Sequence, residues 1–190
     1  MYRTVYLSFW LLFMLNFPAN SQEQDNAPAN NSVSAKWEYY PAGNIFSFRM
    51  RRGLTNHGHL YYGLGYNIAR RQDFGKHELE EGSGPGLTFS YRYFLKPAFK
   101  GLFIDGNLGI WSLKINWEDD RETPQFMQGS TRIWVLQPTL GVGYQFSPKN
   151  SAWSFEGGIA GGIEWNVITN GSPVGQGGIS ILFLGFSRQF

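Results

Sequence analysis

Hydrophobic and polar residues alternate with a period of two from residue 33 to the C-terminus, which is typical of β-strands with one apolar face. Turn-forming residues divide this pattern into eight predicted strands, at 33–41, 44–54, 59–72, 85–95, 102–119, 131–148, 153–168 and 176–190. Short connections alternate with longer ones at 73–84, 120–130 and 169–175, although the first connection, near Pro41, is short. An even number of antiparallel strands with this alternation predicts an up-and-down barrel with both termini at the end of the short turns.

The two faces of the predicted strands carry different residues. In the sixth strand, Trp134, Leu140 and Tyr144 share one face, and Gln137 shares the other with glycines. A soluble lipocalin-like barrel buries its aromatic face, whereas a membrane barrel exposes it. Glycine on the polar face suits a narrow lumen. We therefore predict an all-β fold, an eight-stranded antiparallel up-and-down transmembrane β-barrel over residues 33–190.

Bulky aromatic residues near the strand ends are predicted to form a girdle at each membrane surface. The outer girdle comprises Trp37, Tyr39, Trp134 and Trp165, and the inner girdle comprises Tyr91, Tyr93, Tyr144, Phe146, Trp153 and Phe155.

The fifth predicted strand breaks the alternation. Leu108 and Ile110 share one parity, whereas Trp111, Leu113 and Ile115 share the other. A β-bulge near Ile110 and Trp111 would restore the two faces, and so would a strand that leaves the membrane at this point.

Residues 1–21 have the parts of a secretory signal peptide, with Arg3, an apolar core over 5–17, and Ala19 and Ser21 before the predicted cleavage site. The apolar core is short for a membrane span. Residues 22–32 are polar and are predicted to form a disordered leader. Export of a sequence without cysteine fits a Gram-negative cell envelope.

The signal peptide, the eight amphipathic strands and the terminal aromatic residue resemble the small OmpA/OmpX-type outer-membrane barrels, and the resemblance covers the whole mature chain. Phe190 closes a strand in which Leu184 and Phe186 share its parity. In that family a terminal strand of this kind is recognised by the barrel-assembly machinery, so the resemblance implies that these three residues form an assembly signal.

Charged residues with the parity of the polar face avoid the cost of lipid exposure, about 2–4 kcal/mol for Arg or Lys at the bilayer midplane. They are Lys36, Glu38, Arg49, Arg51, Arg71, Arg92, Asp105, Glu156 and Glu164. Both signs are present, which allows ion pairing. They would form either a gate or a structural plug, and we predict a plugged polar lumen because side chains fill an eight-stranded barrel.

Charges near the outer rim have a different setting. Arg70 and Arg132 have the parity of the lipid face and are expected either to contact lipopolysaccharide phosphates or to remain solvated. The acidic runs at 78–81 and 118–120 are expected either to bridge to those phosphates through a divalent cation or to be solvated loop charge.

Composition excludes several classes of site. The 16 basic and 14 acidic residues are nearly balanced, which argues against a nucleic-acid-binding surface. Without cysteine, disulfides and thiolate metal sites are excluded. His57 and His59 flank a turn, and two histidines alone make a poor metal site. We predict no catalytic residues, no metal site and no cofactor.

The enzyme alternative is a barrel that modifies lipid A, which needs a histidine with a serine and a carboxylate on the outer side. His77 is the outer-side histidine, with Ser83 and either Asp73 or Glu78 nearby in sequence.

We therefore expect a structural or surface-interaction role in envelope integrity, adhesion or host contact. The expected partners are outer-membrane lipid or lipopolysaccharide, the barrel-assembly machinery, and a surface ligand or host protein. The pattern is also compatible with a small pore or, for a soluble protein, with a lipocalin-like ligand carrier.

Overall fold

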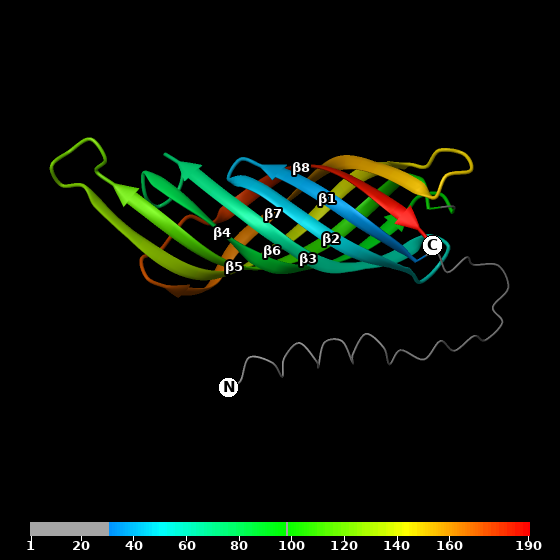
Figure 1. The fold of residues 1–190 in the computed structure, drawn as a ribbon, viewed down its shortest axis with the longest axis horizontal. Coiled ribbons are helices and arrows are strands. Elements are labelled where there is room, and N and C mark those ends of the chain that lie inside the picture. Colours follow the sequence, from blue (N-terminus) through cyan, green and yellow to red (C-terminus); the bar gives the residue numbers. More distant parts are fainter. Residues whose placement is uncertain (1–30, 98) are drawn as a thin grey trace, which may run out of the picture.

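The computed structural model describes residues 31–97 and 99–190, which form a closed barrel of eight antiparallel strands (Figure 1). The strands are β1 Ser32–Tyr40, β2 Gly43–Gly53, β3 Gly58–Gln72, β4 Leu79–Phe94, β5 Gly101–Asp119, β6 Met127–Phe146, β7 Trp153–Asn170 and β8 Gly177–Gln189. Each strand pairs with the next, and β1 pairs with β8 from Ser32 opposite Gln189 to Tyr39 opposite Leu182. The predicted eight-stranded up-and-down barrel is confirmed. The predicted signal peptide and the predicted leader up to residue 30 lie outside the described residues.

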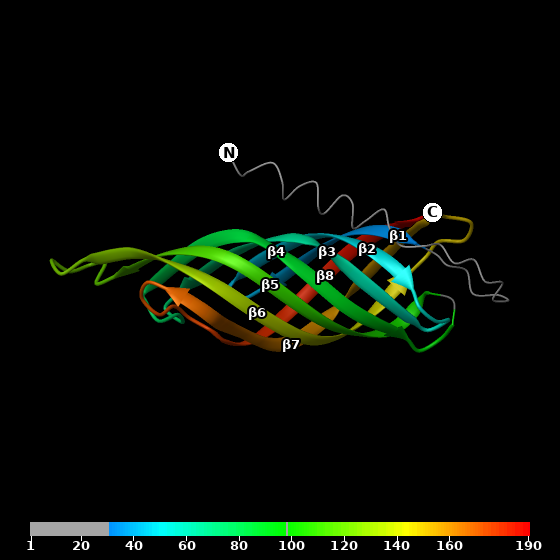
Figure 2. The same cartoon turned by 90° about the horizontal axis from the view of Figure 1, so that it is seen from below.

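The two ends of the barrel differ. At the turn end lie the connections at 54–57, 95–100 and 147–152, together with the C-terminus. At the loop end lie the connections at 41–42, 73–78, 120–126 and 171–176. Figures 1 and 2 both show the hairpin of β5 and β6 extending beyond the other strands at the loop end. The connections predicted at 73–84 and 120–130 are present but shorter, because β4 begins at Leu79 and β6 begins at Met127.

The glycine-rich segment that predicted a loop before residue 85 lies within β4. Gly82, Gly84 and Gly86 lie on the inner side, where an added Cβ would meet β5. Trp111 is paired with Gly86, and Ile115 is paired with Gly82. The glycines therefore continue the strand and leave room for large side chains from the neighbouring strand.

Of the two explanations that the sequence leaves open for the change of alternation in β5, the β-bulge is wrong. The register of β5 against β4 and against β6 is continuous through Ile110 and Trp111. Trp111, Leu113 and Ile115 point into the barrel and are at most 2% exposed. The strand therefore does not change face at Trp111, and the change in alternation arises because the barrel interior is apolar there.

The register irregularity occurs instead between β6 and β7. Trp134 lies opposite Ile168, and Val135 lies opposite Asn166, so Val167 is the additional residue of a β-bulge. Val167 and Ile168 are both exposed as a result.

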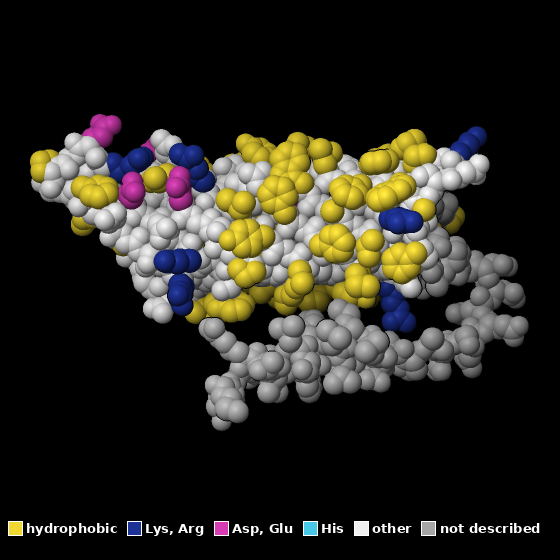
Figure 3. All heavy atoms as spheres, viewed as in Figure 1, with side chains coloured by type: hydrophobic (Ala, Val, Ile, Leu, Met, Phe, Trp, Pro, Cys, Tyr) yellow, Lys and Arg dark blue, Asp and Glu magenta, His cyan; other side chains and the backbone are white. Residues whose placement is uncertain are grey.

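The outer face of the barrel is apolar. Figure 3 shows hydrophobic side chains over the middle of one face, with charged side chains toward its two ends. All ten predicted girdle residues point outward and are between 37% and 60% exposed. This arrangement is the reverse of a soluble barrel, which buries its aromatic face. In the described part of the chain, no helix has the length and apolar character needed to cross a membrane.

Candidate functional site

The barrel interior holds the charged residues that the alternation predicted. All nine point inward, and none is more than 7% exposed. They do not form one network. The structure groups their ion pairs near the turn end, in the middle and near the loop end of the barrel.

The group near the turn end is centred on Arg92, which is fully buried. Its guanidinium donates to Asp105 Oδ2 at 2.9 Å, to Gln145 Oε1 at 3.3 Å and to Glu156 Oε2. Arg49 Nη2 donates to the other oxygen of Glu156 at 2.6 Å. Each carboxylate therefore has an arginine partner, which is what a buried charge requires.

Aromatic side chains surround this group toward the turn end. The guanidinium of Arg51 lies 5.6 Å from the centre of the Phe99 ring. Phe99 lies in the connection after β4, is 6% exposed and contacts His59 edge to face at 4.2 Å. Its φ of 54° is unfavourable for a bulky residue, and the burial of its ring offsets that cost. Phe99 thus reaches into the barrel mouth at the turn end.

The middle of the barrel contains one ion pair, and a large apolar cluster extends from there toward both ends. Lys36 Nζ lies 2.7 Å from Glu38 Oε1 and 4.4 Å from the centre of the Phe183 ring. The indole of Trp111 lies against inward-facing glycines, and its Nε1 donates to Gln137 Oε1 at 2.7 Å. The buried cluster comprises Tyr40, Ala42, Ile45, Ala69, Phe94, Phe103, Trp111, Leu113, Ile115, Ile133, Val135, Val174, Ile181 and Phe183.

The group near the loop end includes a carboxylate that the sequence analysis assigned to a solvated loop. Glu80 is 1% exposed and accepts from Arg71 Nη1 at 3.1 Å. It also accepts from the backbone N–H of Lys76 at 2.7 Å and of Gly175 at 2.9 Å. Arg71 Nη2 donates to Glu164 at 2.5 Å. Glu80 therefore ties two connections of the loop end to a buried arginine.

Sequence parity contains the signal for Glu80. It has the same parity as Thr88, Ser90 and Arg92, all of which point inward from β4. Because residues 73–84 were interpreted as a loop, parity was not applied to Glu80. A small cavity of about 160 Å³ lies beside the group and is lined in part by Tyr40, Arg71, Phe74, Glu164 and Ile179.

His77, in connection 73–78, links the end of β5 to connection 171–176. Its Nδ1 is 2.6 Å from Asp119 Oδ2, and its Nε2 is 3.1 Å from the carbonyl oxygen of Pro173. The imidazole stacks on Trp117 with ring centres 4.2 Å apart. The hydrogen bond from His77 holds the pKa of Asp119 below its ordinary value. Both ring nitrogens therefore face acceptors, an arrangement that suits a structural contact.

In the lipid A enzyme alternative, His77 would act with Ser83 and a nearby carboxylate, but these side chains have other partners in the structure. Ser83 points to the outer face, and its Oγ lies 2.9 Å from Tyr66 Oη. The partners of His77 are Asp119 and Pro173, and the Glu78 carboxylate accepts from the backbone N–H of Arg121. Within 31–97 and 99–190, no three His, Cys, Asp or Glu side chains are grouped as metal ligands.

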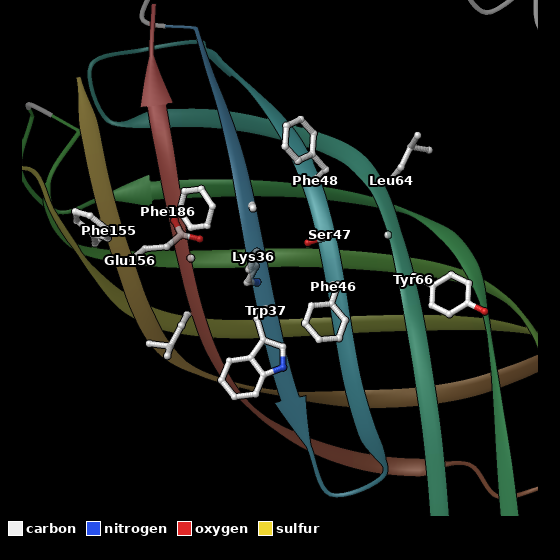
Figure 4. Close-up of a pocket in the computed structure, with 14 residues that line it drawn as sticks. Lys36, Trp37, Phe46, Ser47, Phe48, Leu64, Tyr66, Phe155, Glu156 and Phe186 are labelled. Atoms are coloured by element: carbon white, nitrogen blue, oxygen red, sulfur yellow. The ribbon is translucent and has the colours of Figure 1, made fainter. Parts of the chain in front are cut away.

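One hollow lies in the outer wall of the barrel. An open depression of about 850 Å³ lies over β1, its neighbours on both sides, and the adjoining parts of β3 and β7. Figure 4 shows Trp37 and Phe46 side by side there, with Phe48, Leu64, Tyr66 and Phe186 around them. Ala35, paired with Phe48 and Phe186, forms its floor because its side chain is small.

The two predicted rim arginines have different surroundings. Arg70 Nε lies 2.8 Å from Glu81 Oε1, and both side chains are exposed. Arg132 is exposed and is paired across the strands with Lys114. At the other end, Leu184, Phe186 and Phe190 are all about half or more exposed, and the backbone N–H of Phe190 donates to the carbonyl oxygen of Asn31 at 3.1 Å.

Comparison with solved structures identifies the fold. A major outer-membrane protein of Thermus thermophilus is similar over 86% of this chain and 100% of its own, with a TM-score of 0.53 and 14% identity. The N-terminal β-barrel domain of Pseudomonas aeruginosa OprF is similar over 85% and 98%, with a TM-score of 0.48 and 15% identity. Neisserial surface protein A is similar over 85% and 95%, with a TM-score of 0.46 and 10% identity. No family model and no curated protein matches the chain. At these identities the likeness shows the fold alone.

Proposed function

Because the chain has the fold of bacterial outer-membrane β-barrels, we propose that it spans the outer membrane as a structural barrel whose interior does not conduct ions. The turn end would face the periplasm, and the loop end would face the exterior, as is usual when short turns and long loops alternate. The apolar outer face supports the membrane placement. The outer connections would supply the surface for adhesion or host contact.

The observation that carries the proposal of a closed interior is that side chains occupy both mouths and the middle. Glu80 links connections 73–78 and 171–176 across the outer mouth. Trp111 belongs to the buried apolar cluster, and Phe99 reaches into the mouth at the turn end. A conducting path would have to displace these packed groups, and side chains fill barrels of eight strands.

Planar-bilayer recording tests this proposal. The purified protein is expected to give no reproducible conductance steps above the lipid background. The same preparation is run on a gel in cold SDS and after boiling, so that a missing current is not confused with a missing barrel. Reproducible steps from a preparation that shows the shift on boiling would overturn the closed interior and favour a small pore.

The proposal assigns no catalytic reaction to the barrel. It is supported by the contacts of His77, whose two nitrogens face Asp119 and Pro173. Mass spectra of lipid A from cells with and without the gene are expected to show the same acylation. A change in acylation that follows the gene would contradict this assignment.

Assembly is expected to use the C-terminal strand, in keeping with the outward positions of Leu184, Phe186 and Phe190. Phe190→Ser is expected to reduce the amount of folded barrel in the outer membrane. An equal amount of folded barrel would contradict a role in recognition by the assembly machinery.

A further inference from the structure

Two cations face each other on the outer surface near the loop end. Lys114 of β5 and Arg132 of β6 occupy directly paired positions, and both side chains are exposed. Residues paired in this way have Cβ atoms about 4.5–5.5 Å apart, and like charges there destabilise the sheet. In the described residues, neither side chain has an ion pair or a hydrogen bond. The pair therefore lacks the carboxylate that neutralises Arg70.

The positions around this pair carry no acidic side chain. Its neighbours across the strands and along them are Ser83, Ser112, Asn116, Ser130, Trp134 and Asn170. Serine and asparagine can donate hydrogen bonds to an anion. The nearest carboxylate on this face, that of Glu81 opposite Asn116, is engaged by Arg70 at 2.8 Å. The surface is thus basic and rich in hydrogen-bond donors.

The pair also lies at a defined depth relative to the apolar belt, which is the apolar outer surface between the outer and inner aromatic girdles. Trp134 of the outer girdle follows Arg132 along β6, and Phe146 of the inner girdle ends that strand. The two aromatic residues are about 40 Å apart along the strand and, at a tilt of about 45°, about 28 Å apart along the barrel axis. This matches the apolar band of about 25 Å in such barrels. Arg132 is two residues farther out, at the level of lipid headgroups.

We propose that Lys114 and Arg132 bind the phosphate group of an anionic lipid in the outer leaflet. The Arg132 guanidinium can donate two parallel hydrogen bonds to phosphate oxygens, and Lys114 supplies a second positive charge. The phosphate removes the repulsion between the two cations, while the acyl chains lie over Trp134 and the apolar belt below it. A lipid phosphate is favoured over a soluble one because the pair directly adjoins this belt. The inference rests on the proposed membrane placement.

Native mass spectrometry of the full protein in a zwitterionic detergent measures this binding. The protein is titrated separately with phosphatidic acid, with phosphatidylcholine and with inorganic phosphate. At about 1 kcal/mol for each basic residue near a membrane surface, Lys114→Gln with Arg132→Gln should weaken phosphatidic acid binding roughly thirty-fold. The control, Lys96→Gln with Lys100→Gln, removes the same charge from the opposite end and should leave binding within about twofold of the parent.

The stability of the same variants provides a second measurement whose sign depends on the lipid. In phosphatidylcholine vesicles, the double substitution at 114 and 132 should leave the urea midpoint unchanged or raised, because repulsion is removed. In vesicles with one-tenth phosphatidic acid, the parent midpoint should rise and that of the double variant should not. A variant that simply failed to fold would be less stable in both lipids, and this result would overturn the proposal.

Three further results overturn the site. The first is that the parent protein shows no preference for phosphatidic acid over phosphatidylcholine. The second is that the double variant retains this preference. The third is that inorganic phosphate binds as well as the lipid, which would indicate a soluble-anion site. The shift between unboiled and boiled samples in cold SDS reports separately on the barrel, so failure of the lipid site and failure of the proposed function are distinguishable.

Discussion

Replacing Arg92 with methionine removes the centre of the largest buried ion-pair group while keeping an unbranched side chain. Arg92 bonds to Asp105 at 2.9 Å and to Glu156, and its guanidinium lies 3.7 Å from the centre of the Phe103 ring. Glu156 would retain Arg49 as a partner at 2.6 Å. Asp105, which is 3% exposed, would lose the ion pair formed with Arg92.

The expected loss follows from leaving a buried carboxylate without its partner. Removing one member of a buried ion pair costs about 3–5 kcal/mol. The lost contact with the aromatic ring acts in the same direction, but the two effects share atoms and are not added. With a urea dependence of about 2 kcal/mol per molar, Arg92→Met should lower the unfolding midpoint by about 1.5–2.5 M.

Urea titration in phosphatidylcholine vesicles, with the folded fraction measured by migration in cold SDS, gives this midpoint. Arg188→Met is the matched control, because Arg188 is exposed and its guanidinium lies 5.7 Å from the Trp153 ring centre. It should cost less than about 1 kcal/mol. Adding Asp105→Leu to Arg92→Met should recover part of the loss, since the unpaired carboxylate is removed. If Arg92→Met costs no more than Arg188→Met, the buried network does not stabilise the barrel and the reasoning is refuted.

Three further predictions concern other parts of the barrel. Trp111→Ala should lower the free energy of unfolding by about 3–5 kcal/mol in the same titration, and a loss below about 1 kcal/mol would show that the apolar layer collapses around the gap. Glu80→Ala should speed tryptic cleavage after Lys76 because the connection loses its buried acceptor, and unchanged cleavage would contradict this role. In a ¹³C NMR titration, Asp119 should titrate below its ordinary pKa, and His77→Gln should raise the midpoint. This contact therefore stabilises the loop end above about pH 4 and is lost as the pH falls through the folded pKa of Asp119; an unchanged midpoint in His77→Gln would exclude the hydrogen bond as the cause.

Many of the interior residues could be predicted, because the side of the sheet to which a side chain points follows from its position along its own strand. Arg49 and Arg92 have the parity of neighbouring small and polar residues, and that parity alone placed them inside. Glu80 was missed for a different reason. Glu80 has the parity of the other inward residues of β4, but glycine and proline around residues 82–86 indicated a loop. Strand pairing with β5 overrides this local preference.

The aromatic side chains at the centre and at the turn end required information that is not local. Trp111 broke the simple rule that inward means polar, because inward-facing glycines on β3, β4 and β5 itself make room for its ring. Phe99 lies in a connection, where alternation says nothing about direction. Its inward-facing ring contacts the buried ring of His59 on β3 edge to face.

The sequence by itself determined the number of strands, their antiparallel order and the face of the residues that alternate regularly. The period of two is set by the backbone of each strand and needs no knowledge of its neighbours. The tertiary structure decided which inward residues meet, as when it paired Glu80 with Arg71 and Arg49 with Glu156. It also placed Lys114 opposite Arg132 on the outer face. These contacts depend on the register between strands and on closure of β1 against β8, both of which bring together residues that no local pattern relates.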